Sequence, residues 1–344
     1  MQDRHNFTDR SLVTAVIPTR GRPDLLFCAV RSALRQTWRH LEVLVVVDGR
    51  DAETEARLAI FPDPRLRILI LPEPAGGSAA RNVGVHAARG EWIAFLDDDD
   101  EWLPEKIERQ MSAVRDSSAW FPVISCRLIA QSPTASRVLP LRAYDSSQPI
   151  ADYLFCRRGL TDPGGLLQTS TLLAPRDLLL AIPFQDGLPM HQDWDWMIRV
   201  AGQVGVSIVM LPKPLSIWRV DDARATVGRG SDWQFSLAWI RCVRTLISRR
   251  AFSSFVAIQC VWRARKSRAS LRDRFVILCA FLFEGRPEWR SLFHFAVFGL
   301  MPVRLRAALR DRFRHSPKHV DAMPGLSLAW THKPGHAALR KSSL

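Results

Sequence analysis

The strongest constraint in this sequence is a run of five acidic residues, Asp97 to Glu101, that directly follows an apolar segment. That segment, Glu91 to Leu96, is rich in aromatic and branched residues and is predicted to form a short buried strand. Adjacent carboxylates repel one another, so the run needs either a bound cation or full exposure to water. Hard divalent cations take oxygen ligands, and Mg²⁺ is typically held by one or two carboxylates together with substrate phosphates. The buried strand and the following Trp102 favour a metal–phosphate site over a solvated acidic loop.

Apolar runs alternate with helical patterns through the first hundred residues. Strands are predicted at 12–19, 41–47, 66–71 and 91–96, with helices at 23–34 and 77–88 and another beginning near residue 104. This alternation indicates an α/β fold built on a largely parallel sheet, whose ligands bind beyond the carboxyl ends of the strands. Three strand ends carry polar groups suited to a nucleotide: Thr19, Asp48 and Asp97. In an extended loop Asp97 and Asp99 project to the same side, which suits one ion.

Charge separates the last third of the chain from the rest. Residues 1–230 hold 27 basic and 28 acidic residues, whereas residues 231–344 hold 21 basic and 6 acidic ones. Apolar runs in this basic part are shorter than the ~20 residues that a spanning helix needs, and they alternate with arginines. This basic part is interpreted either as amphipathic helices lying on an anionic membrane or as a helical subdomain packed on the core, with one further alternative. A nucleic-acid partner is a third, although no nucleic-acid-binding motif accompanies the arginines.

Several classes of protein are disfavoured by what the sequence lacks. The six cysteines show no metal-binding spacing, which indicates reduced thiols in a cytosolic setting. The polar start, Met1 to Asn6, is not typical of a signal peptide. Neither the glycine-rich dinucleotide motif nor the P-loop motif occurs, so those nucleotide folds are not expected.

Five segments in a fixed order carry a resemblance to a known family. They are 16–19 (Val-Ile-Pro-Thr) with Arg22-Pro23, 46–49 ending in Asp-Gly, 77–84 with Arg81-Asn82, 95–104 with the acidic run, and 192–196 (Gln-Asp-Trp-Asp-Trp) leading to Arg199. Residues 12 to about 222 resemble family 2 glycosyltransferases. The resemblance implies the GT-A fold, a Rossmann-like, mostly parallel sheet flanked by helices. It also implies transfer of a sugar from a nucleotide-diphosphate donor to a hydroxyl acceptor with inversion.

The resemblance implies roles for individual residues of this chain. The expected donor-binding residues are Pro18, Thr19, Arg20, Asp48, Arg81, Asp97 and Asp98. Asp99 and Asp97 match a metal-binding Asp-x-Asp, where Mn²⁺ or Mg²⁺ would neutralise charge on the departing nucleotide. Asp193 matches the catalytic base that takes the proton of the acceptor hydroxyl. On position alone, Asp193 is more simply read as an acid that stabilises a helix N-terminus.

The sequence departs from the family pattern at several positions. Gln192 stands where the family commonly has an acid, which leaves less charge to raise the pKa of Asp193. Asp221 stands where many members have a histidine, and it is either a metal ligand or a solvent-facing acid. Arg20 and Gly21 replace a common Tyr-Asn pair and would alter contacts to the donor phosphates. His191 is expected either at the surface or in contact with the acceptor.

We therefore expect a tail at 1–10, a GT-A catalytic domain at 11–225, a basic amphipathic helical region at 226–314 and a disordered tail at 315–344. The expected activity is metal-dependent and inverting, in the synthesis of surface polysaccharide or glycolipid. A glycan or lipid-linked acceptor and a place on the cytoplasmic face of the cell membrane are expected with it. The alternatives are a non-catalytic glycan- or nucleotide-binding protein on the same fold and a basic nucleic-acid-binding protein.

Overall fold

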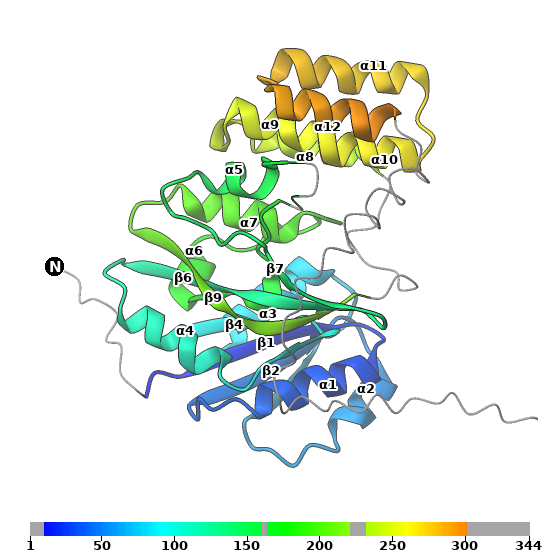
Figure 1. Ribbon diagram of the computed structural model, residues 1–344. Helices are drawn as coiled ribbons and strands as arrows, with labels where there is room; N and C mark the ends of the chain where they lie inside the picture. Colours follow the sequence, from blue (N-terminus) through cyan, green and yellow to red (C-terminus); the bar gives the residue numbers. More distant parts are fainter. Residues whose placement is uncertain (1–9, 160–161, 163, 221–231, 301–344) are drawn as a thin grey trace, which may run out of the picture.

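The computed structural model describes residues 10–159, 162, 164–220 and 232–300 (Figure 1). Across these residues nine strands form one mixed sheet in the order β3-β2-β1-β4-β8-β6-β9-β5, with β7 paired to β6. The strands are β1 (Val13–Thr19), β2 (Leu41–Val47), β3 (Leu66–Ile70), β4 (Trp92–Phe95), β5 (Asp100–Trp102), β6 (Phe121–Gln131), β7 (Ser136–Leu139), β8 (Leu173–Pro175) and β9 (Val206–Arg219). The first four strands run parallel, as do β6 and β9, while β5, β7 and β8 pair antiparallel. The predicted α/β fold class is confirmed.

Alternate residues of the central strands feed two separate cores, because successive side chains of a strand point to opposite faces. Val13, Ala15 and Ile17 belong to one core, and Val16 belongs to the other. The first face is covered by α1 (Pro23–Leu34), α2 (Ala52–Leu58) and α4 (Lys106–Arg115). The second is covered by α3 (Gly77–Ala87), α6 (Arg176–Ala181) and α7 (Gln192–Ala201). Strands β1, β2 and β4 are buried on both faces, which explains their continuous apolar runs.

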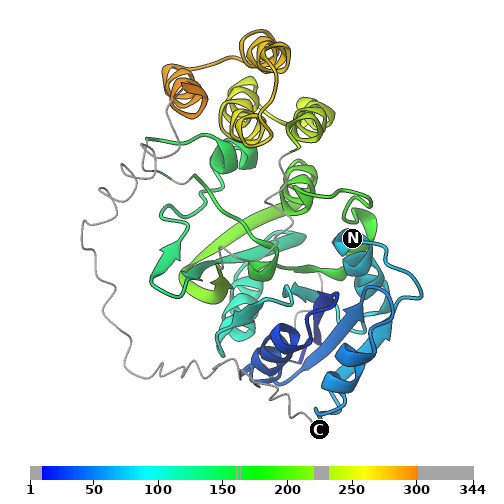
Figure 2. The same cartoon turned by 90° about the vertical axis from the view of Figure 1, so that its right-hand side faces the viewer.

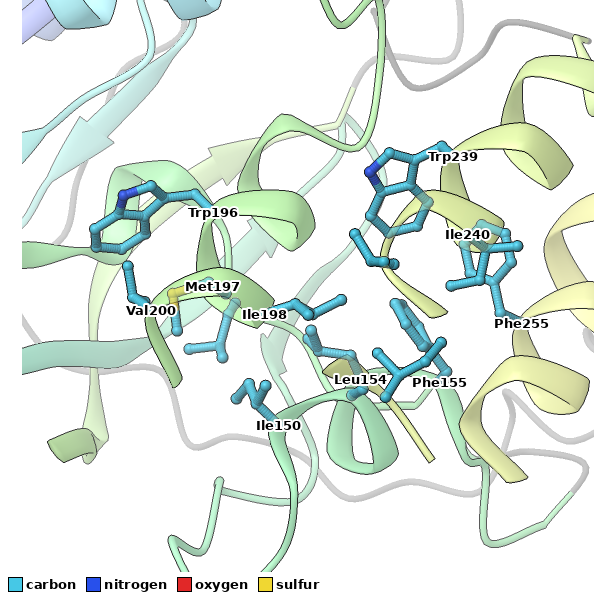
Figure 3. Packing of buried hydrophobic residues seen from close by; sticks show 14 of the residues in the cluster. Ile150, Leu154, Phe155, Trp196, Met197, Ile198, Val200, Trp239, Ile240 and Phe255 are labelled. Atoms are coloured by element: carbon cyan, nitrogen blue, oxygen red, sulfur yellow. The ribbon is translucent and has the colours of Figure 1, made fainter. Parts of the chain in front are cut away.

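The basic C-terminal region forms a third layer on the side of α7 (Figures 1 and 2). Its helical segments are α8 (Trp233–Cys242), η3 (Arg244–Leu246), α9 (Arg249–Phe255), the π-helix η4 (Val256–Cys260), α10 (Val261–Lys266), α11 (Leu271–Cys279), the π-helix η5 (Ala280–Glu284) and α12 (Trp289–Leu300). The layer packs on α7 and on α5 (Ile150–Phe155). The 3-10 turn η1 (Thr169–Thr171) belongs to the α/β domain and contacts β4 and β6. Figure 3 shows Leu154 and Phe155 of α5 facing Ile240 and Phe255 of this layer. The described part of the region therefore packs on the α/β domain.

The predicted elements agree with the structure at most positions. The four predicted strands match β1 to β4 to within a residue or two at each end. The spacing of apolar residues from Trp233 to Ser248 predicts one amphipathic helix, which is wrong. Helix α8 ends at Cys242, and the Ser248 hydroxyl accepts the N–H of Ala251 and caps α9. The predicted boundary near residue 226 and both terminal tails, apart from Arg10, lie outside the described residues and stay predictions. None of the helices in the described ranges is both long and apolar enough to cross a membrane.

Candidate active site

The carboxyl ends of β1, β2 and β4 lie side by side, as the sequence predicts. The N–H of Asp48, just beyond β2, donates to the carbonyl of Thr19 at the end of β1, at 2.9 Å. Val16 of β1 pairs with Phe95 of β4, so the acidic run emerges level with Thr19. The Thr19 hydroxyl donates to Asp98 at 2.8 Å. One edge of the sheet thus brings the three predicted strand ends together.

The five acids of the run occupy different surroundings. Asp100 is buried at the start of β5 and accepts hydrogen bonds from the Ser170 hydroxyl and the Gln168 amide, each at 2.6 Å. Glu101 is buried and pairs with Arg219 of β9. The premise that the whole run needs a cation or water is therefore wrong, because protein groups satisfy these side chains.

The first three acids of the run, Asp97 to Asp99, lie nearer the site than Asp100 and Glu101 do. Asp98 is buried and lies 3.2 Å from the guanidinium of Arg22, which is also 3.3 Å from Asp99. The side chains of Asp97 and Asp99 keep exposed fractions of 26% and 21%. These two carboxylates are therefore the ones that a ligand can reach.

Burial also raises the pKa values of two acids in the run. It raises the pKa of Asp98 to about 6, although the nearby Arg22 opposes the shift. It raises the pKa of Asp100 well above the ordinary range, and the neighbouring Asp97 and Asp99 add to that shift. Compared with an ordinary aspartate, Asp100 is therefore shifted toward its protonated form.

Arg81 of α3 connects the acidic run to α7. One terminal nitrogen of its guanidinium pairs with Asp97, and the other donates to the Gln192 side-chain oxygen at 2.8 Å. The guanidinium carbon also lies 5.7 Å from the centre of the Phe184 ring. Gln192, which stands in place of the family's usual acid, is thus a hydrogen-bond acceptor for this arginine.

Asp193 lies in the first turn of α7, next to this bridge. Burial raises its pKa to about 6, and the negative charge of Asp97 adds to the shift, while the Trp194 N–H and Arg81 lower it. Burial, rather than a neighbouring acid at position 192, is therefore the main cause of the raised pKa. The charge of Asp97 acts on Asp193, so the predicted base and the predicted metal loop lie near one another.

Asp48, a predicted donor-binding residue, holds the loop before α3 in place. Its carboxylate accepts the backbone N–H groups of Ala75 and Gly76, the latter at 3.0 Å, just before α3. Beside it lies a pocket of about 500 Å³ whose walls include Arg20 and Gly49. Gly49 has φ +94°, and a side chain there would meet Pro74 at 2.9 Å. This pocket has the position and size to hold a nucleoside.

His191 is buried, so the surface alternative is wrong, while contact with the acceptor stays a prediction. Its backbone is left-handed (φ 67°), and its ring stacks on Trp194 with centroids 5.0 Å apart. The ring Nε2 lies 3.0 Å from the hydroxyl of Ser236 in α8. Burial lowers its pKa to about 3, so the imidazole is neutral. A lone histidine carries no sequence signal for such packing.

A second contact holds α7 on the other side of Asp193. The indole N–H of Trp239 in α8 donates to Asp195 at 3.1 Å, and Arg199 pairs with the other oxygen at 2.7 Å. Asp195 is thus structural. Together the contacts of His191 and Asp195 fix the start of α7, and with it Asp193, against the C-terminal layer. Neither Ser236 nor Trp239 stood out in the sequence.

The donor set for a cation is small. Among the described residues, no group of three or more His, Cys, Asp or Glu side chains is arranged to hold a metal. Asp97 and Asp99 supply two reachable carboxylates, which fits a Mg²⁺-type site completed by substrate phosphates. Asp221 lies outside the described residues. The roles of Pro18, Thr19, Arg20, Asp48, Arg81, Asp97, Asp98, Asp99 and Asp193 stay predictions, although most of these residues surround one site.

Comparison with known proteins identifies similar sequences. Residues 14–139 match the family model for glycosyl transferase family 2. The chain is 27% identical over 269 residues to the amylovoran biosynthesis glycosyltransferase AmsB of Erwinia amylovora, covering 75% of this chain and 86% of that one. It is 32% identical over 113 residues to the UDP-Glc:alpha-D-GlcNAc-diphosphoundecaprenol beta-1,3-glucosyltransferase WfgD of Escherichia coli. That second match covers 33% of this chain and less than half, 45%, of the relative.

Solved structures share the fold. S. aureus TarS 1-349 superposes with a TM-score of 0.54 at 16% identity, covering 89% of this chain and 92% of that one. The mannosyltransferase PcManGT from Pyrobaculum calidifontis, in complex with GDP-Man and Mn²⁺, superposes with a TM-score of 0.50 at 15% identity. That match covers 89% of this chain and 88% of the other.

Trp239→Phe tests the contact between α8 and α7. The substitution removes the indole N–H and leaves a buried oxygen of Asp195 without its donor, so we expect the free energy of unfolding to fall by about 1–3 kcal/mol. Urea denaturation measures the change. Trp289→Phe, at a side chain that is 71% exposed, is the matched control and should have little effect. Equal effects of the two substitutions would contradict the structural role of Trp239.

Proposed function

Because this chain carries a family 2 glycosyltransferase domain of the GT-A fold, we propose that it is a metal-dependent, inverting enzyme. It moves a sugar from a nucleotide-diphosphate donor to a hydroxyl group of a glycan or lipid-linked acceptor. The observation that carries this proposal is the Arg81 bridge, which joins Asp97 of the predicted metal loop to Gln192, the residue before the predicted base.

The donor would lie along the edge formed by β1, β2 and β4. The pocket beside Asp48 and Arg20 would take the nucleoside, and the diphosphate would reach Asp97 and Asp99. A divalent cation on these two carboxylates would supply Lewis-acid stabilisation of the departing diphosphate. The fit of the donor set rests on two reachable oxygen-bearing side chains, with the donor phosphates as the remaining ligands.

Asp193 would act as the general base. An acceptor hydroxyl is a poor nucleophile, so a carboxylate must take its proton as the oxygen attacks the anomeric carbon. A pKa of about 6 leaves Asp193 ionised at neutral pH and makes it a stronger base than an ordinary aspartate. Attack from the side opposite the diphosphate inverts the anomeric centre in one displacement.

The named relatives support a place in surface-glycan synthesis. AmsB is named for amylovoran biosynthesis, and WfgD is named for a diphosphoundecaprenol-linked acceptor. We propose a similar role for this chain, in building polysaccharide or glycolipid on the cytoplasmic face of the cell membrane.

The outermost helices support membrane association. Large apolar side chains are exposed on α11, η5 and α12: Leu271, Phe275, Val276, Leu282, Phe283, Trp289, Leu292 and Phe293. Exposed arginines stand among them at 272, 274, 286 and 290. Aromatic side chains beside arginines suit the interface of an anionic bilayer, where each basic residue near the surface contributes roughly 1 kcal/mol. We propose that this outer face, the α11–α12 face, docks on anionic lipid.

Nucleotide binding tests the donor side. In a thermal-shift screen we expect a nucleoside diphosphate to raise the melting temperature of the protein more with Mn²⁺ than without it. Asp99→Asn removes one charge from the metal loop and should abolish the Mn²⁺-dependent part. Asp116→Asn, at an acid whose side chain is 74% exposed, is the control and should behave like the wild type. A nucleotide effect that ignores Mn²⁺ in the wild type would refute metal dependence.

The pH dependence of kcat/KM tests the base. Only the carboxylate form accepts a proton, so we expect activity to rise with pH and to reach half its maximum near pH 6, the raised pKa of Asp193. Asp193→Asn should lower turnover by roughly 10²–10⁴-fold. Because the pKa of Asp98 is raised to the same range, Asp98→Asn is the decisive comparison. If Asp193 is the base, this variant keeps the acidic limb of the profile; loss of the limb in Asp98→Asn would assign it to Asp98.

Sedimentation with vesicles tests the α11–α12 face. We expect the protein to pellet with vesicles that contain phosphatidylglycerol, and to do so less at high salt because exposed charges are screened. The double substitution Phe283→Ser and Trp289→Ser should reduce the pelleted fraction several-fold. Val204→Ser, at a 97% exposed position before β9, is the control. Equal pelleting of the double variant and the wild type would exclude this face as the docking surface.

A further inference from the structure

An apolar pocket of about 220 Å³ lies between the catalytic domain and the C-terminal layer. Its walls include Phe155, Trp194, Trp218, Phe255 and Ile258, and Arg157 stands among them. We propose that this pocket binds the hydrocarbon segment next to the diphosphate of a lipid-linked acceptor. The inference rests on the proposed glycosyltransferase function and specifies the chemistry of its acceptor.

The position of the pocket connects it to the active site. Trp194 directly follows the proposed base, Asp193, in α7. Trp218 of β9 pairs across the sheet with Asp100, the residue after the metal loop. Two walls of the pocket therefore come from residues adjacent to the base and to the loop. A ligand held there would lie near the proposed base and the metal loop.

The chemistry of the walls selects the ligand. Most lining side chains are aromatic or aliphatic, which favours hydrocarbon over a sugar with many hydroxyl groups. Arg157 is the one cation among the described residues that line the pocket, and a guanidinium matches the geometry of a phosphate. The volume exceeds the ~150 Å³ of an apolar cavity that admits benzene. The pocket therefore has room for a short hydrocarbon segment with a phosphate at one end.

The helical wall of the pocket leads toward the proposed membrane surface. Ile258 and Gln259 belong to the π-helix η4, a rare element that is frequent at functional sites. On its other side η4 packs against α12, which carries the exposed Trp289 and Phe293. A lipid leaving a bilayer at the α11–α12 face would thus meet η4 before it reaches Asp193.

Calorimetric titration with farnesyl diphosphate tests the proposal, on protein already saturated with Mn²⁺ and the nucleoside diphosphate it prefers. Occupying the donor site prevents the diphosphate probe from binding there. We expect farnesyl diphosphate to bind at least tenfold more tightly than inorganic pyrophosphate or farnesol, because the pocket contacts both parts of the molecule. If pyrophosphate binds as tightly, the site recognises phosphate alone and the proposal is wrong.

Two variants locate the binding site. Ile258→Trp fills the pocket and should weaken farnesyl diphosphate at least tenfold, whereas Leu246→Ser, at an exposed side chain on η3, should not. The double substitution Phe283→Ser and Trp289→Ser should also leave this binding intact, because it alters the outer face and not the pocket. Unchanged binding in Ile258→Trp, or its loss in the double variant, would place the probe elsewhere and overturn the inference.

Nucleotide binding separates this inference from the proposed function. A wild-type protein that binds nucleoside diphosphate with Mn²⁺ but not farnesyl diphosphate would refute the lipid pocket alone. A wild-type protein that binds no nucleoside diphosphate would refute the proposed function itself. The same nucleotide titration on Ile258→Trp checks that this variant is folded.

Discussion

The site depends on one guanidinium, that of Arg81, which contacts Asp97 with one nitrogen and Gln192 with the other. These two residues are far apart in the chain and belong to opposite sides of the site. Gly77, one turn earlier in α3, makes the bridge possible: a side chain there would lie 3.2 Å from Arg81 and 3.3 Å from Gln192. Gly77 and Arg81 thus together hold the predicted metal loop, Asp97 to Asp99, and the start of α7 in fixed positions relative to each other.

The acidic run shows how a protein can keep like charges together. Hydrogen bonds from Ser170 and Gln168 hold Asp100, whose raised pKa favours the neutral form. Arg219 neutralises Glu101 at the far end of the run. Arg22 pairs with Asp98, and the carboxylates of Asp97 and Asp99 stay partly exposed at the edge of the sheet. Two anionic groups partly compensated by arginines suit a cation that arrives with its own anionic ligand.

Sequence reasoning succeeded where the signal is local. Continuous apolar runs located β1, β2 and β4, and the polar residues that end them converge because parallel strands end at one edge. It failed where burial depends on partners far along the chain. The sequence around Asp100 does not indicate its partner Ser170, and the sequence around His191 does not indicate its partner Ser236, so neither buried contact was predicted.

The basic C-terminal region illustrates a different limit. Helical periodicity correctly indicated apolar faces, but it cannot state what a face covers. The structure divides these faces between two environments: Trp239, Ile240 and Phe255 pack inward on the catalytic domain, whereas Phe283 and Trp289 face outward. The excess of arginines reflects the outward part, and the aromatic content reflects both.

The hydrogen bonds between α8 and α7 limit how independently the two parts of the chain can change in evolution. Ser236 and Trp239 hold the residues on either side of Asp193. The α/β domain therefore needs the C-terminal layer to fix the start of α7. A chimera that joins residues 10–220 to the C-terminal helical layer of a relative would need that layer to supply matching partners for His191 and Asp195. Lineages of this architecture are therefore expected to change donor specificity in the loops beside Asp48, while the C-terminal helical layer and the start of α7 evolve as one unit.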